Sequence, residues 1–302
     1  MNRLAVNIAG VIFKNPVITA SGTFNSGKEY SRFYDLANLG GITVKGVSHQ
    51  PWPGNPAPRT AETYGGMLNA VGLQNPGAQA FIAEDLPFLR QQDTCVIVNL
   101  CGKTEDEFIA VARDFDGVEG VDLFELNISC PNIKDGGKAM GQDPHMTEHM
   151  TREMKKHLHA PLVVKLSPNV TDIATIAKAA EAGGADGISL INTVLGMQID
   201  IHKRRPVLGN KLGGLSGPAI KPVAVRMVYQ VAQAVNLPII GMGGIMTGDD
   251  AIEFIMAGAT AVAVGMANFT NPQAPMDILG GINAYMDRYN IKNISEIRGV
   301  IS

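Results

Sequence analysis

Eight short apolar runs recur along this chain, and they restrict its possible folds more than any other feature. Each run is rich in β-branched residues, is nearly continuous in its hydrophobicity, and ends at Gly, Pro or a polar residue. Parallel strands that are covered on both faces have this pattern, whereas half-exposed strands alternate. The runs are PVITA (16–20), GITVKGV (41–47), CVIVNL (95–100), LFELNIS (123–129), PLVVKLS (161–167), GISLINT (187–193), PIIGMGG (238–244) and AVAVGMA (261–267).

Helical patterns lie between most of these runs, at 104–115, 171–183 and 248–259. Strands that alternate with helices over 302 residues predict an α/β fold of the (β/α)8 TIM barrel type. The alternative is a doubly wound open sheet, but no GxGxxG motif follows the first strand. Residues 4–13 predict a small N-terminal β-hairpin with a turn near Ala9 and Gly10, placed to close the barrel floor.

We expect one domain, residues 1–302, because no interdomain linker is evident. The long connections at 48–76 and 194–218 are rich in Pro and Gly, and loops of this length in a compact domain are usually functional. Both are therefore expected to be active-site loops.

Composition excludes several classes of function. The net charge of −3, with dispersed cations, does not favour nucleic acid or an anionic membrane as a partner. Three cysteines without CxxC spacing argue against a disulfide framework or an iron–sulfur site in this chain. No signal peptide and no apolar stretch of membrane-spanning length is evident, so a cytoplasmic protein is expected.

Reactive groups in a barrel lie at the C-terminal ends of the strands. These ends are polar here and almost free of carboxylates, which disfavours a metal site or a glycosidase. Amides and lysines suit a flat, hydrogen-bonding ligand that gains negative charge during the reaction. The strand-end residues are Ser21, Lys45, Asn99, Asn127, Cys130, Lys165, Asn192, Thr193, Gly243, Gly244, Gly265 and Met266.

Glycines follow the last two predicted strands, where many barrels bind phosphate through backbone N–H groups and a short helix N-terminus. Tight turns alone would also explain these glycines. Lys45 and Lys165 lie within apolar runs, and a lysine is rarely buried unless it is paired. They predict anionic or carbonyl partners at the barrel mouth, the alternative being lysines that reach solvent at the barrel floor.

The histidines carry less signal. His145 and His149 lie in an amphipathic segment that predicts an exposed helix rather than a metal site, because the pattern is HMTEH and not HExxH. The basic run 202–206 is either a solvated loop or part of an interface. Cys130 follows a strand end and precedes Pro131, so it is either a packed thiol or a reactive one.

Long segments of the chain resemble the type 1B dihydroorotate dehydrogenases, and the resemblance runs from Val17 to Gly265 and beyond. The segments that carry it are ITVKGVSHQPWPGNPAPR, GMLNAVGLQNPG, ELNISCPNIKDGGKAMGQDP, LVVKLSPNV, INTVLGMQID and GMGGIMTGDDAIEFIMAGATAVAVG. This resemblance implies an FMN-binding barrel, an oxidoreductase that converts (S)-dihydroorotate to orotate in de novo pyrimidine biosynthesis. It implies NAD⁺ as the final acceptor, reached through a separate subunit with FAD and a 2Fe–2S cluster. A homodimer within a heterotetramer is also implied.

The resemblance also implies residue roles. Cys130 would be the base that removes the C5 proton of dihydroorotate, while C6 delivers hydride to N5 of FMN. Residues implied to bind FMN are Ser21, Lys45, Gly46, Asn99, Asn127, Lys165, Ile191, Gly217, Gly243, Gly244, Gly265 and Met266. Residues implied to bind the substrate are Lys45, Asn69, Ala70, Val71, Gly72, Leu73, Asn127, Asn192 and Thr193. Met266 stands where a threonine is expected in this family, which removes a possible hydroxyl contact to phosphate.

Two kinds of alternative remain at the level of sequence. One is another FMN barrel, similar to a dihydropyrimidine dehydrogenase module or to a dihydrouridine synthase. The other is a flavin-free barrel that uses Cys130 as a covalent nucleophile on a purine nucleotide. Bound FMN, visible as a yellow colour, would distinguish an FMN barrel from the flavin-free barrel.

Overall fold

Eight parallel strands close into a barrel in the computed structural model, which describes residues 2–128 and 140–301. Neighbouring strands follow the chain order around the barrel, and the last strand pairs with the first. The barrel strands are β3 (Val17–Thr19), β4 (Gly41–Thr43), β7 (Cys95–Leu100), β8 (Leu123–Asn127), β9 (Leu162–Lys165), β10 (Gly187–Leu190), β15 (Ile239–Met242) and β16 (Ala261–Val264). The predicted (β/α)8 barrel is confirmed, and each barrel strand falls within one of the eight apolar runs.

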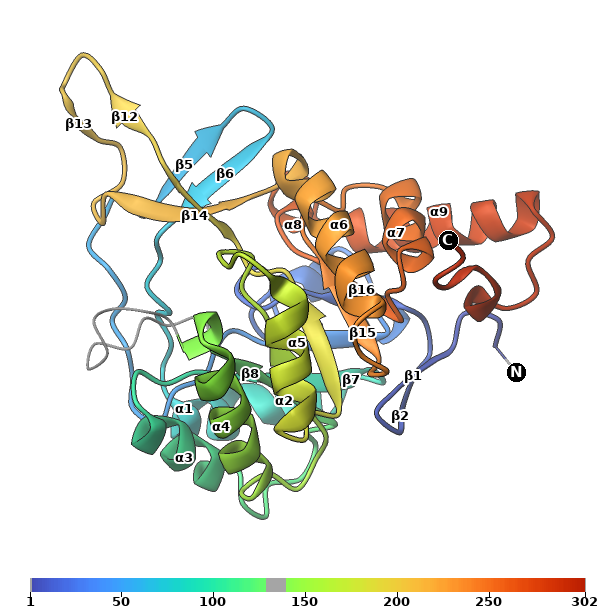
Figure 1. Ribbon diagram of the computed structural model, residues 1–302, viewed down its shortest axis with the longest axis horizontal. Coiled ribbons are helices and arrows are strands. Elements are labelled where there is room, and N and C mark those ends of the chain that lie inside the picture. The colour runs from blue at the N-terminus through green and yellow to red at the C-terminus, as the bar shows by residue number, and fades with distance from the viewer. Residues whose placement is uncertain (1, 129–139, 302) are drawn as a thin grey trace.

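Helices cover the outside of the barrel (Figure 1). The longer ones are α3 (Glu105–Asp114), α4 (Pro144–Lys155), α5 (Ile173–Ala182), α6 (Lys221–Ala232), α7 (Gly248–Met256) and α9 (Ala274–Arg288). The short ones are α1 (Ala78–Ala80), α2 (Leu86–Leu89), α8 (Ala267–Thr270) and a π-helical turn (Phe81–Asp85) that connects α1 to α2. Single 3-10 turns lie at Tyr30–Arg32, Leu36–Asn38, Met140–Gln142, Pro218–Ile220 and Ile294–Ile297.

Side-chain caps fix where several of the helices begin. Thr104 accepts a hydrogen bond from Glu107 N at the start of α3, and Asp172 accepts one from Ala174 N at the start of α5. Thr247 and Asp250 form a reciprocal capping box on α7. The capping box therefore satisfies the amides of Thr247 and Asp250 within the chain.

An N-terminal hairpin closes the floor of the barrel, as predicted. Strands β1 (Val6–Ile8) and β2 (Val11–Phe13) pair antiparallel around the turn at Ala9 and Gly10. The buried side chains of Ile8 and Phe13 pack against interior residues of the barrel strands, including Ile97 and Val163. The reactive end of the barrel is consequently the opposite one.

The two long connections, predicted as loops, contain strands. Strands β5 (Thr60–Thr63), β6 (Gly66–Asn69), β11 (Val194–Met197) and β14 (Leu212–Ser216) form a separate sheet in the order β11-β14-β6-β5. The central pairing joins β6 to β14. Because these segments are far apart in the chain, no local sequence pattern predicts that they pair. Beyond this sheet a two-stranded hairpin, β12 (Ile199–Asp200) and β13 (Arg205–Pro206), projects away from the barrel (Figure 1).

Candidate active site

A cavity of about 240 Å³ lies at the C-terminal end of the barrel, between the strand ends and the additional sheet. Its walls come from the segments that follow β3, β4, β10, β15 and β16, and from β6 and β14 of the additional sheet. Among the described residues, no Asp, Glu or His lines it, and its two ionisable side chains are Lys45 and Lys165. The cavity therefore favours a ligand rich in acceptors or in negative charge.

Lys165, the last residue of β9, has only 5% of its side chain exposed. Its Nζ donates to Ser21 Oγ at 2.9 Å, and it lies 3.3 Å from Glu125 Oε1. A buried ammonium is costly unless it is paired and hydrogen-bonded, and both conditions are met here. These two contacts hold the ammonium of Lys165 in one orientation at the cavity wall.

Glu125 is the centre of a buried polar cluster that lies behind the cavity wall. Its Oε1 accepts from Asn99 Nδ2 at 2.6 Å, and its Oε2 accepts from Ser189 Oγ at 2.9 Å. Glu125 is 2% exposed and does not itself line the cavity, whereas Asn99 and Lys165 do. The carboxylate thus fixes two cavity side chains from behind.

Asn99 has one hydrogen-bonding atom to spare. Its side chain is fully buried, and Oδ1 has no partner among the described residues. Because a buried acceptor without a donor is unfavourable, and because Asn99 lines the cavity, this oxygen is suited to a donor of a bound ligand.

Lys45 follows β4 and is partly buried at the cavity wall. Burial lowers the pKa of its ammonium, the positive charge of Lys165 lowers it further, and Cys101 acts in the opposite direction. Lys45 and Lys165 share one cavity, so an anionic ligand beside Lys45 would favour its charged form.

Glycines form one side of the cavity, where the loops after β14, β15 and β16 meet. Gly244 has a φ of +82°, and a Cβ there would lie 2.8 Å from Gly217 O and 2.9 Å from Lys221 N. Gly265 differs, because a Cβ there would meet only the Ala20 Cβ, at 3.5 Å. One glycine is required by backbone approach, and the other leaves space in the cavity.

Amide side chains line the side of the cavity nearer the additional sheet. Asn192 Oδ1 accepts from Thr193 N at 2.8 Å, and its Nδ2 lies 3.5 Å from Asn127 Oδ1. Asn69 Nδ2 lies 3.4 Å from Gly214 O. These side chains present donors and acceptors to one ligand face.

The structure brings the predicted site residues together with two exceptions. Every residue predicted to bind FMN lines the cavity, as do Lys45, Asn69, Val71, Leu73, Asn127, Asn192 and Thr193 from the substrate set. Ala70 and Gly72 do not line it. The backbone of Ala70 pairs with Arg59, and a Cβ on Gly72 would meet Asn55. Cys130 lies outside the described residues.

Glu125 is not among the predicted site residues, although its position in the sequence carries a signal. An acidic residue inside an otherwise apolar strand, two positions before Asn127, shares that residue's face of the strand. The cavity also includes Thr23, Ser216 and Phe269, which no strand-end pattern indicated.

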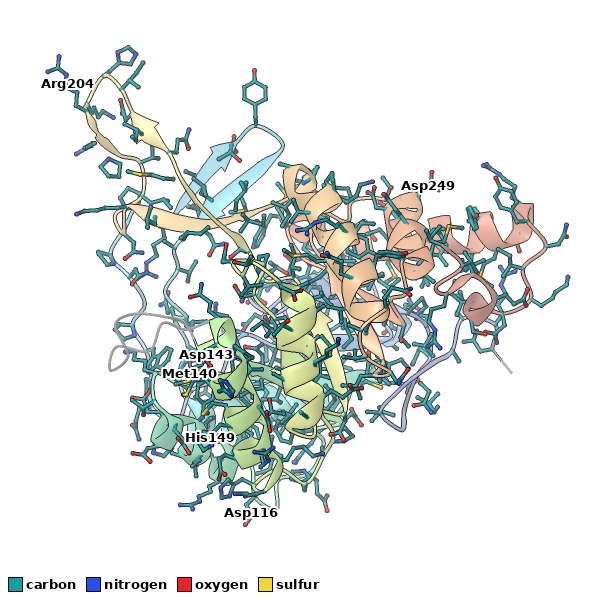
Figure 2. The ribbon with its side chains drawn as sticks, in the orientation of Figure 1. Asp116, Met140, Asp143, His149, Arg204 and Asp249 are labelled. Atoms are coloured by element: carbon teal, nitrogen blue, oxygen red, sulfur yellow. The ribbon has the colours of Figure 1, made fainter. Side chains whose placement is uncertain are left out.

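The histidine-containing helix and the basic run lie away from the cavity lining. Figure 2 shows His149 on the outside of α4, where Nε2 lies 3.1 Å from Glu105 Oε1. Arg204 lies at the outer end of the β12–β13 hairpin (Figure 2). The predicted exposed helix is confirmed.

Comparison with known proteins decides the family. The family model for dihydroorotate dehydrogenase matches residues 3–286. The chain belongs to the dihydroorotate dehydrogenase family. The chain is an oxidoreductase of this family, as its sequence predicted.

Individual relatives make the assignment finer. The dihydroorotate dehydrogenase B (NAD(+)), catalytic subunit, of Alkaliphilus metalliredigens is 64% identical over 296 residues, which cover 98% of both chains. The protein of the same name from Geobacillus sp. strain WCH70 is 52% identical over 299 residues, 99% of this chain and 96% of its own. The predicted type 1B assignment is confirmed.

A solved structure supports the fold. The crystal structure of DHODH in complex with ferulenol from Eimeria tenella superposes with a TM-score of 0.81 at 23% identity, covering 99% of this chain and 89% of that one. This similarity concerns the barrel architecture. Among the described residues, no helix is both long and apolar enough to cross a membrane.

Proposed function

We propose that this chain oxidises (S)-dihydroorotate to orotate in pyrimidine biosynthesis, with FMN as its own cofactor. The observation that carries the proposal is a cavity walled by two lysines, several amides and a glycine cradle, at the reactive end of a barrel of the dihydroorotate dehydrogenase family. We also propose that residues 1–302 form one FMN-binding domain located in the cytoplasm.

The residues present fit FMN. The apolar side chains of Ile191 and Met242 line the cavity beside the polar groups, as a flat ring requires. Asn99 Oδ1 offers a buried acceptor without a partner in the part of the chain that the structure describes. The space at Gly265 accepts a group that a side chain would displace.

Phosphate would lie against the loops that contain Gly217, Gly243, Gly244, Gly265 and Met266. The amides of Met246 and Thr247, just before α7, are already used, because Asp250 Oδ2 accepts from both. The backbone of the glycine-containing loops would carry the anion without these two amides. Met266 would contribute backbone and no hydroxyl.

When bound, FMN supplies the hydride acceptor. Lys165 would lie beside the ring, where its fixed ammonium stabilises negative charge that grows during reduction. Lys45 would hold the substrate carboxylate. Burial lowers the pKa of this ammonium, and an anionic partner would favour its charged form.

Asn69, Asn127 and Asn192 would orient the substrate through its amide edges, since each side chain has both donor and acceptor atoms. Val71, Leu73 and Thr193 would complete this side of the cavity. The same segment holds Ala70 and Gly72, whose role in binding would be through the shape of the backbone.

Cys130 is proposed as the base that removes the C5 proton. A positioned base contributes roughly 10²- to 10⁴-fold to such a step, and a thiol with a usual pKa of about 8.5 is suited once it is deprotonated. This role rests on sequence alone, because Cys130 lies outside the described residues.

Electrons would leave this chain for NAD⁺ through a separate subunit that carries FAD and a 2Fe–2S cluster. The names of the relatives, which describe a catalytic subunit of an NAD(+) enzyme, support this division of labour. A homodimer of this chain within a heterotetramer is the proposed assembly.

The test is purification of this chain alone and together with its partner subunit. The chain alone should be yellow, should release FMN on denaturation, and should reduce an artificial acceptor with dihydroorotate. NAD⁺ reduction should require the partner. A colourless chain that binds no added FMN, or one inert towards dihydroorotate, would overturn the proposal.

A further inference from the structure

Glu125 and Lys165 form an ion pair that is almost completely buried. Only 3% of the Glu125 side chain and 5% of the Lys165 side chain are exposed. A buried ion pair is a weak source of stability, because desolvation offsets most of the attraction. Stability alone therefore does not explain the pair, and its position in the barrel matters.

That position is directly behind the cavity wall. Glu125 contacts Asn99 and Lys165, which line the cavity, and Ser189, which does not. Lys165 continues the chain of contacts to Ser21, another lining residue. A single carboxylate thus orients side chains on two neighbouring strands, β7 and β9, from the strand between them.

We propose that Glu125 is a positioning residue that holds Lys165 and Asn99 at the ring of the flavin and sets how much positive charge the ring experiences. This inference rests on the proposed FMN function. The carboxylate offsets part of the lysine charge, so the ring experiences less positive charge than Lys165 alone would supply.

The sign of the effect follows from this arrangement. Reduction places negative charge on the flavin, and an uncompensated ammonium nearby favours the reduced form. Removing the Glu125 charge while keeping its shape should make the bound FMN easier to reduce. If Glu125 served only to hold the fold together, the reduction equilibrium would not move in this direction.

The first test compares E125Q with D186N in the FMN-loaded protein. Gln keeps the size and one acceptor of Glu125. Asp186 is the matched control, because it also pairs with a lysine, Lys155, but it contacts Leu162 N at the opposite end of β9. Both variants remove one carboxylate charge from the chain.

We expect E125Q to shift the equilibrium for flavin reduction, measured against a redox dye, towards reduced FMN by roughly tenfold or more. D186N should leave it within about twofold of the wild type. An E125Q equilibrium that is unchanged, or that shifts towards oxidised FMN, would overturn the proposal.

The second test needs no cofactor and so separates this inference from the FMN assignment. K165M leaves the Glu125 carboxylate buried without its counter-charge, and this should lower the melting temperature of the apoprotein. Adding E125Q to K165M removes that charge and should raise the melting temperature again. A double variant no more stable than K165M would show that the two side chains are not coupled, and would also overturn the proposal.

The two tests give distinguishable outcomes. A wild-type chain that binds no FMN contradicts the proposed function, while the melting temperatures still decide whether Glu125 and Lys165 act as a pair. If E125Q alone fails to fold, the melting temperatures of K165M and of the double variant still decide whether Glu125 and Lys165 are coupled.

Discussion

A methyl group added at Gly244 should damage both the fold and the FMN site. Its φ of +82° lies in the region that costs an L-residue roughly 1–2 kcal/mol. The Ala Cβ would lie 2.8 Å from Gly217 O and 2.9 Å from Lys221 N, and overpacking of this kind costs roughly 1–3 kcal/mol. Backbone atoms on both sides cannot move without displacing the loops proposed to hold the phosphate.

Together these effects predict a loss of about 2–5 kcal/mol for G244A, or about 3–8 °C in melting temperature for a chain of this length. G280A is the matched control, because nothing lies within 4 Å of a Cβ at this position in α9. It should be neutral or stabilising by up to roughly 1 kcal/mol, since Ala is the better helix former.

G265A completes the comparison. Its Cβ would meet only Ala20 and would otherwise extend into the cavity. We expect an unchanged apoprotein melting temperature and FMN binding weakened roughly tenfold or more, because the methyl group occupies cofactor space. Thermal melts and fluorescence titration with FMN measure both. A G244A variant as stable as G280A would refute the steric argument, and a G265A variant with wild-type affinity would refute the placement of FMN.

Three further predictions concern the lysine, the base and the cofactor. Burial lowers the pKa of Lys45, so as pH rises the folded apoprotein loses this proton before the unfolded chain does. The stability of the wild type relative to K45M should therefore rise with pH, between the lowered pKa and the usual value of 10.5. Paired thermal melts of the two proteins measure this difference. A flat difference between the two proteins would contradict this. C130S should retain FMN yet show flavin reduction by dihydroorotate slowed roughly 10²-fold or more at neutral pH in stopped-flow absorbance, because a serine hydroxyl does not ionise there; unchanged reduction would remove Cys130 from the base role. Stripping FMN should lower the melting temperature, and adding FMN at about a hundred times its dissociation constant should restore roughly 2.7 kcal/mol. A melting temperature indifferent to FMN would contradict binding to the folded state.

Much of the barrel could be predicted from sequence because parallel strands covered on both faces leave a local signal. The run at 95–100 coincides with β7, and the helix pattern at 104–115 with α3 and its Thr104 cap. The additional sheet could not be predicted in this way, because its strands are not continuous apolar runs and β5 and β11 are partly exposed. The pairing of β6 with β14 depends on contacts between distant segments.

The cavity residues were predictable for a related reason. Strand ends of a barrel meet at one place, so Asn127 and Lys165 become neighbours once the fold is known. The role of Glu125 was less accessible, because a single carboxylate in a strand does not show which lysine it faces. Only the folded structure shows that Glu125 lies behind the cavity wall and that Lys165 lies at it.

Anaerobic mixing of the FMN-loaded chain with dihydroorotate tests the central claim most directly. The account predicts that the yellow absorption of the flavin disappears and that one orotate forms for each flavin reduced, without NAD⁺ or the partner subunit. Persistence of the oxidised flavin spectrum in the presence of dihydroorotate would contradict it.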